Sequence, residues 1–99
     1  MPAALRAESS ISHLESLLAK HSGLAHLRVR ARGSLLLVES GDSNDRIPHA
    51  RFRRDTVHLW ILEFPDHRGR WQRTPYRAQL HELFDLVCTT FPWTLAPLT

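Results

Sequence analysis

The chain is poor in cysteine and has no long hydrophobic run. Cys88 is its single cysteine, which excludes an internal disulfide and a zinc site built from cysteines. The longest strictly aliphatic run is Leu35–Val38, which is too short to span a bilayer, so we expect no membrane partner. The first residues, Met1–Arg6, lack the apolar stretch of a signal peptide. We therefore expect a soluble protein of the cytoplasm.

Positive charge comes almost entirely from arginine and is concentrated in the middle of the chain. Lys20 is the only lysine, and eleven of the twelve arginines lie within residues 28–77. That segment also holds six carboxylates, so its net charge is +5, whereas the 27 residues before it are neutral and the 22 after it carry −2. Such an uneven field attracts acidic partners. The net charge of the whole chain is only +3, which is small for a nucleic-acid binder.

The length and composition predict one folded domain, residues 1–99, with a modest core. Residues 1–8 show no regular apolar spacing, and we expect them to form a flexible arm. The segment 92–99 carries Trp93, Leu95 and Leu98. We expect this apolar segment to pack on the core or on a partner chain.

Changes in hydrophobic period predict the order helix, strands, helix. Apolar residues spaced three and four apart predict a helix over about 10–21. Thr74 as an N-cap and Pro75 at the first position predict a second helix, which ends before Pro92. Between them, alternating or continuous apolar runs predict strands over 26–32, 35–38, 49–54 and 57–64, with a short edge strand over 70–73.

These elements predict an α+β fold. An antiparallel meander of four to five strands lies between the two helices, and both helices cover one face of the sheet. The result is a two-layer sandwich with one open sheet face.

Arginines alternate with apolar residues in the first and third predicted strands. Both strands flank the second one, so their outward side chains share one surface. We call this surface the arginine face, and its members are Arg28, Arg30, Arg32, Arg51 and Arg53. The same alternation predicts that His49 points outward as well. Arginines in this arrangement bind carboxylates or phosphates, or they cover the leucines of the second strand with their stems while their heads stay in water.

The register of the segment 57–64 decides whether an aromatic side chain joins the arginine face. In one register His58 and Trp60 point outward, and in the other Val57, Leu59 and Ile61 do so. Both registers are compatible with the sequence.

The segment Asp66–Trp71 concentrates two arginines and a tryptophan in a turn. Arg68, Arg70 and Trp71 have the composition of a recognition loop, because tryptophan and arginine dominate interface hot spots. Alternatively, Trp71 folds back over the sheet edge with Arg70 stacked on it.

The seven histidines invite a catalytic or metal-binding interpretation. No pair has the spacing of a zinc-binding helix, so we predict neither a metal nor a cofactor. A ribonuclease-like site needs a general base, a general acid and a cation on one face. The residues that could supply them are Glu63 or Asp55, His58 or His49, and Arg51 or Arg53.

We interpret the chain as a non-catalytic binding module that docks an acidic partner. The preferred partner is another protein of a shared complex. A nucleic-acid binder that stacks bases on Trp60 or Trp71 is the alternative, and a small ribonuclease-like enzyme or toxin is the second alternative. Dimerisation through an edge strand or through the segment 92–99 is compatible with the binding module. The predicted partner-binding residues are Arg28, Arg30, Arg32, Arg51, Arg53, Trp60, Arg68, Arg70 and Trp71.

Overall fold

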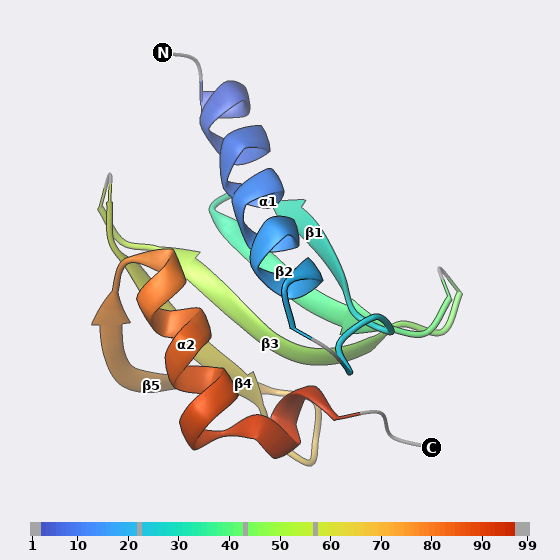
Figure 1. Cartoon of the computed structure of the whole chain (residues 1–99). Coiled ribbons are helices and arrows are strands. Elements are labelled where there is room, and N and C mark those ends of the chain that lie inside the picture. Colours follow the sequence, from blue (N-terminus) through green and yellow to red (C-terminus); the bar gives the residue numbers. More distant parts are fainter. Residues whose placement is uncertain (1–2, 22, 43, 57, 97–99) are drawn as a thin grey trace.

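The computed structural model describes residues 3–21, 23–42, 44–56 and 58–96, with side chains from Ser10 onward. Two helices enclose five strands along the chain (Figure 1). The elements are α1 (Ala3–Ala19), β1 (Arg28–Arg32), β2 (Leu35–Ser40), β3 (Ile47–Arg54), β4 (Trp60–Pro65), β5 (Trp71–Ala78), α2 (Leu80–Thr90) and the 3-10 helix η1 (Pro92–Leu95).

The strands form one antiparallel sheet in the order β1-β2-β3-β4-β5, which is a simple meander. In Figure 1, α1 and α2 both lie in front of the sheet. The predicted α+β fold is therefore confirmed. Because the helices occupy one layer, the opposite sheet face is left without a helical cover.

The core lies between the two layers and is built from alternate residues of the strands. Leu36 and Val38 of β2 point into it, as do Ala50 and Phe52 of β3, while the residues between them point to the open face. Each helix contributes one apolar stripe, as the spacing of its apolar residues predicts. The buried helical residues are Leu14 and Leu18 of α1 and Leu80, Leu83, Phe84 and Val87 of α2.

The first helix is longer than its apolar pattern indicates. It begins at Ala3 rather than near Ser10, so most of the segment 1–8, expected as a flexible arm, is helical. The segment Ala3–Glu8 consists of alanine, leucine, arginine and glutamate, all of which have high helix propensity. Propensity accounts for a helix that begins before the apolar pattern of residues 11–18.

The boundary between β5 and α2 lies later in the chain than predicted. Thr74 does not cap a helix, because its Oγ1 donates a hydrogen bond of 2.8 Å to the carbonyl of Leu62 in β4. Pro75 falls where the register between β4 and β5 shifts, and a bulge tolerates a residue without an N–H group. α2 starts at Leu80, where the backbone N–H of Gln79 donates to Oε1 of Glu82 at 3.1 Å.

The segment after α2 closes one end of the core. Leu95 of η1 is 3% exposed, and Leu98 lies outside the described residues. His49 donates from Nδ1 to the carbonyl of Thr94 at 2.8 Å, and His26 donates from Nε2 to the carbonyl of Leu95 at 2.7 Å. The segment 92–96 is thus fastened to the sheet and to the β1 side of the molecule.

His49 does not point outward with Arg51 and Arg53 as predicted. The register of β2 and β3 shifts between Val38 and Glu39, and the extra residue of this bulge reverses the alternation of side chains. His49 is therefore 3% exposed, and its Nε2 is 2.7 Å from the hydroxyl of Ser40. Since Nδ1 is the donor to Thr94, Nε2 accepts from the hydroxyl in the neutral ring.

None of the helices within the described ranges has the length and apolar character needed to cross a membrane.

Replacement of Phe52 by alanine tests the position of the core. Phe52 is 1% exposed, so Phe52→Ala should lower the free energy of unfolding by about 3–5 kcal/mol. Trp93→Ala is the control, because Trp93 is 66% exposed and should change that free energy by about 0.5 kcal/mol or less. Urea denaturation of the two variants measures the difference, and equal losses would contradict this core.

Candidate binding surface on the open sheet face

The structure brings the five members of the arginine face together on the open side of the sheet. In β1, Val29 and Ala31 pack against the core, so the arginines before, between and after them point away from it. In β3, Arg51 and Arg53 alternate with the buried Phe52. β2 runs between β1 and β3, which places all five arginines over three neighbouring strands.

A buried carboxylate, that of Glu63 in β4, lies next to the arginine face and contacts three guanidinium groups. Arg51 donates from Nε to Oε1, and Arg53 donates from Nε to Oε2 at 3.3 Å. Nε of Arg73, from β5, is 3.5 Å from Oε2. Glu63 is 3% exposed, so a carboxylate that would be costly to bury alone is neutralised by cations from two strands.

The charge on Glu63 depends on these arginines. Burial by itself raises the pKa of the Glu63 carboxyl, but the hydrogen bonds and charges of Arg51 and Arg53 outweigh it and hold the pKa below its ordinary value. Glu63 is therefore ionised at neutral pH and acts as an internal counter-ion.

Glu39 in β2 is a second internal counter-ion. Arg30 donates from Nε and Nη2 to its two carboxylate oxygens at 2.9 and 3.0 Å, which is the bidentate geometry that arginine prefers. The Arg30 hydrogen bond lowers the pKa of Glu39 against the opposing effect of burial, and the charges of Arg30, Arg46 and Arg28 lower it further.

The stems of the arginines also cover the apolar strand beneath them. Leu37 of β2 is only 7% exposed, although neither of the helices α1 and α2 lies over this side of the sheet. Its neighbours across the two ladders are Arg30 and Arg51. Arginine stems of this kind bury apolar surface while their heads remain at the surface, so packing and charge are combined in the same side chains.

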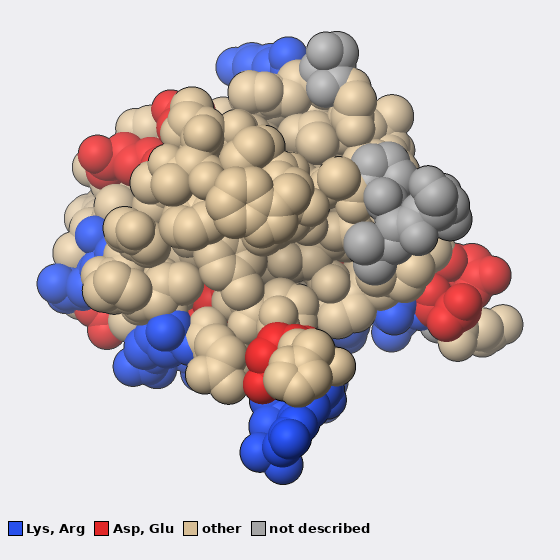
Figure 2. All heavy atoms as spheres, turned by 90° about the horizontal axis from the view of Figure 1, so that it is seen from below, with Lys and Arg blue, Asp and Glu red and all other residues tan. Residues whose placement is uncertain are grey.

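The charges on this surface do not balance. The arginine face and Arg73 together carry six positive charges, and the carboxylates that pair with them are those of Glu39 and Glu63, so these eight side chains have an excess of four positive charges. Arg28 and Arg32 are exposed, and the side chain of Arg73 is 60% exposed. Figure 2, a view of the end that carries η1, shows most of the positive side chains along the lower rim and an uncharged surface in the middle.

Trp71 lies at the start of β5, beside the arginine face. The guanidinium carbon of Arg51 is 4.5 Å from the centroid of its ring, which is a cation–π contact. The sequence leaves open whether Arg70 stacks on Trp71, and in the structure the guanidinium over this ring is that of Arg51. Arg70 is exposed, as is Arg68, in the turn between β4 and β5.

Asp66 orders that turn. Its Oδ1 accepts hydrogen bonds from the backbone N–H groups of Arg68 and Arg70 at 2.8 and 2.9 Å, and Gln72 donates to Oδ2 at 3.1 Å. The bond from Arg70 has the largest effect on the carboxyl, and together these donors hold the pKa of Asp66 below its ordinary value. The turn therefore presents Arg68 and Arg70 on a structured backbone.

Trp60, also among the predicted partner-binding residues, lies on the other side of the sheet. It is 6% exposed and belongs to the core. β4 pairs with β3 so that Ile61 is opposite Arg53 and Glu63 is opposite Arg51, and this register turns Trp60 inward. Of the two registers that the sequence allows, the structure has the one with Ile61 outward, while Val57 lies outside the described residues.

The residues considered for a ribonuclease-like site do not come together as one set. Glu63 and the two arginines are adjacent, but His49 is buried against Ser40 and Thr94. His58 lines a cavity beside the helices. Asp55 forms an ion pair with Arg77. Within the described part of the chain, no three histidine, cysteine, aspartate or glutamate residues are grouped so that they could hold a metal ion.

The sequence interpretation missed three residues of this surface. It did not place Arg73 beside the arginine face, and it did not pair Glu39 and Glu63 with the arginines. The alternation that starts at Trp71 places Arg73 on the same side of β5, and this signal was available. The pairing of Glu63 with Arg51 depends on the register of β4, which the sequence leaves open.

Comparison of the chain with protein-family models, with curated proteins and with solved structures finds no match.

Replacement of Glu63 by glutamine tests its role as counter-ion. The variant Glu63→Gln should lose about 3 kcal/mol of stability at pH 7, because Arg51 and its neighbours then lack a buried negative charge. Urea denaturation gives the value. Glu15→Gln, at an exposed position of α1, is the matched control and should leave the stability almost unchanged.

The role of Glu63 as a counter-ion also predicts that the stability lost in Glu63→Gln depends on pH. The pKa of Glu63 is lower in the folded chain than its ordinary value of 4.5. Its ionised form therefore stabilises the fold above that value, and this contribution disappears as the pH falls through the folded pKa. The stability difference between the unmodified chain and Glu63→Gln should thus shrink on acidification below 4.5. A difference that stays constant would contradict the role of the carboxylate.

Proposed function

We propose that the chain is a non-catalytic binding module that docks an acidic segment of a partner protein within a shared complex. The docking surface consists of the arginine face extended by Arg68, Arg70, Trp71 and Arg73. The observation that carries this proposal is the excess of four positive charges among the arginine face, Arg73 and their two carboxylate partners, on a sheet face that none of the described helices covers.

The internal ion pairs support the proposal because they leave guanidinium donors for a partner. A guanidinium group has five N–H donors. Arg53 and Arg73 each approach Glu63 through Nε, and their side chains are 34% and 60% exposed. A carboxylate of a partner could bind the remaining donors in the bidentate geometry, while Glu63 keeps the guanidinium groups in place.

The structure of the surface favours an acidic protein over a nucleic acid. Single-stranded nucleic acids bind through basic grooves with aromatic side chains on which bases stack. Trp60 is inside the core, and the ring of Trp71 carries the guanidinium of Arg51 at 4.5 Å. A nucleic acid would therefore find cations on this surface but fewer aromatic rings on which its bases could stack.

Neutralisation of two exposed arginines tests the docking surface. We expect Arg28→Gln with Arg32→Gln to weaken binding of the protein partner about tenfold or more, because each lost charge-assisted hydrogen bond contributes roughly 1 kcal/mol or more. Both residues are exposed, so the fold should persist. Lys20→Glu changes the net charge by the same amount in the helical layer and should leave binding intact.

The measurement is capture of partners from native lysate by the tagged chain at about 100 mM salt, where charges separated by more than roughly 10 Å are largely screened. Each sample is divided and half is treated with nuclease. A partner protein that survives nuclease, is retained by Lys20→Glu and is lost by the double variant supports the proposal. Equal capture by both variants would overturn it, and material that nuclease removes would favour the nucleic-acid alternative.

A further inference from the structure

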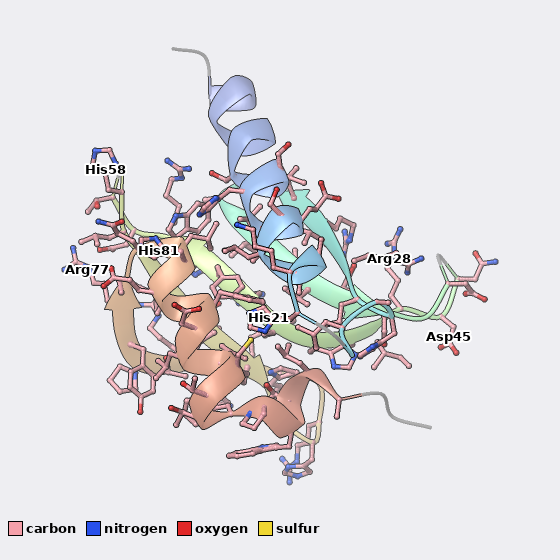
Figure 3. The ribbon with its side chains drawn as sticks, viewed as in Figure 1. His21, Arg28, Asp45, His58, Arg77 and His81 are labelled. Carbon is pink, nitrogen blue, oxygen red and sulfur yellow. The ribbon has the colours of Figure 1, made fainter. Side chains whose placement is uncertain are left out.

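A second site lies in the other layer, at the end of the molecule where both helices and the turn between β3 and β4 meet. A cavity of about 300 Å³ opens there. Figure 3 shows His58 in this turn and His81 at the start of α2, at the same end of the molecule. We call it the histidine cavity, and its polar lining residues are Ser10, His13, Arg54, His58, Gln79 and His81.

Two histidines face each other across the helical layer. The rings of His13 in α1 and His81 in α2 have centroids 6.4 Å apart and planes at 79°. Both side chains are exposed, and so is that of His58. A neutral imidazole offers one N–H donor and an imidazolium offers two, so these rings can bind the oxygens of a small ligand from different sides.

Arg54 provides a cation at a defined position in the cavity wall. Its guanidinium carbon is 4.6 Å from the centroid of Trp60, and its Nη2 donates to the hydroxyl of Ser10 at 3.1 Å. Trp60 is a core residue that also borders the cavity. The guanidinium is therefore held by the core and by α1 before any ligand arrives, which reduces the entropy lost on binding.

The chemistry of the lining favours an anion. The described side chains around the cavity include one permanent cation and three imidazoles, and they include no carboxylate. Within the described residues no cluster suited to a metal ion is present, and the guanidinium of Arg54 would repel a cation. A ligand that is negatively charged and rich in acceptor oxygens complements this lining.

The distribution of the donors favours a phosphate group over a carboxylate. Ser10 and His13 come from α1, Arg54 from β3, His58 from the following turn and His81 from α2. The donors that line the cavity come from four segments, and a tetrahedral group presents oxygens in several directions, whereas a carboxylate has two in one plane. The volume is at the lower end of the roughly 300–1,000 Å³ of small-molecule sites.

We propose that the histidine cavity binds the phosphate group of a small phosphate ester. Arg54 supplies the fixed cation, and His13 and His81 donate hydrogen bonds from opposite helices. The volume of about 300 Å³ suits an ester the size of a single nucleotide or smaller. This site is separate from the docking surface and does not depend on the proposed function.

Nuclear magnetic resonance of the histidine rings tests the proposal and locates the ligand. The chain is titrated at about pH 6.5 with inorganic phosphate, with uridine 5′-monophosphate and with glycerol 3-phosphate. The ring signals of His13 and His81 should shift and saturate with each probe. The signals of His67, which is exposed in the turn between β4 and β5, should stay in place. Tighter binding of the nucleotide would identify a nucleoside ester as the source of the phosphate, and equal affinities would show that the phosphate alone is recognised.

Two variants separate the cavity from the arginine face. Arg54→Gln should weaken phosphate binding about tenfold or more, because a hydrogen bond to a charged group is lost. Arg54 also packs on Trp60, so His81→Gln, at an exposed position, is the second variant and should weaken binding without affecting the fold. Arg32→Gln removes an exposed arginine of the arginine face and should leave the affinity unchanged.

Three results would overturn the proposal. The first is the absence of saturable shifts at His13 and His81 with every probe. The second is an equal shift of His67, which would indicate general attraction of anions to a basic chain. The third is a loss of affinity in Arg32→Gln together with full affinity in folded His81→Gln, which would place the phosphate on the arginine face.

Discussion

The burial of the Glu63 carboxylate among arginines is the interaction on which the open side of the sheet depends. An antiparallel sheet can leave one face in water when the side chains on that face are polar, but β2, an interior strand, has the apolar Leu37 on the open face. Here arginine stems cover Leu37, and their heads are held in position by Glu63 and by Glu39. Without these internal carboxylates the guanidinium groups would lack the partners that hold the arginine stems over Leu37. The same cations that complete the packing of the sheet thus form the surface proposed for docking.

Much of the fold could be predicted from the sequence, because the period of the apolar residues changes with each element. The alternation in β1 and β3 identified both the strands and their outward arginines. The start of α2 was misplaced, since Thr74 and Pro75 form a good helix start and fit a bulged strand equally well. In the structure the pairing of Ile61 with Arg77 decides between the two. That contact is tertiary, and no local propensity encodes it.

The two sites differ in how far the sequence reveals them. The arginine face comes from residues that alternate within short segments, so a local pattern is sufficient to find it. The histidine cavity combines residues 10 and 13 with residues 54, 58, 79 and 81, and these meet only when the helices dock side by side on the sheet. The direction of Trp60 is likewise not encoded locally. β4 has apolar residues at both odd and even positions, so only the pairing of Glu63 with the arginines decides which side of the sheet Trp60 faces.

The bulge opposite Val38 and Glu39 has a consequence for how the C-terminal segment can change in evolution. The contact between His49 and Thr94 exists because one additional residue in β3 turns the ring toward η1. Substitutions along β3 preserve that additional residue, whereas the deletion of a single codon in this strand would restore regular pairing and turn the ring to the opposite side. Attachment of the C-terminal segment is therefore sensitive to insertions and deletions in a strand more than 40 positions away in sequence. Variants of this chain that differ in length at β3 would carry a C-terminal cover that lacks this hydrogen bond and is held by Leu95 and the bond from His26.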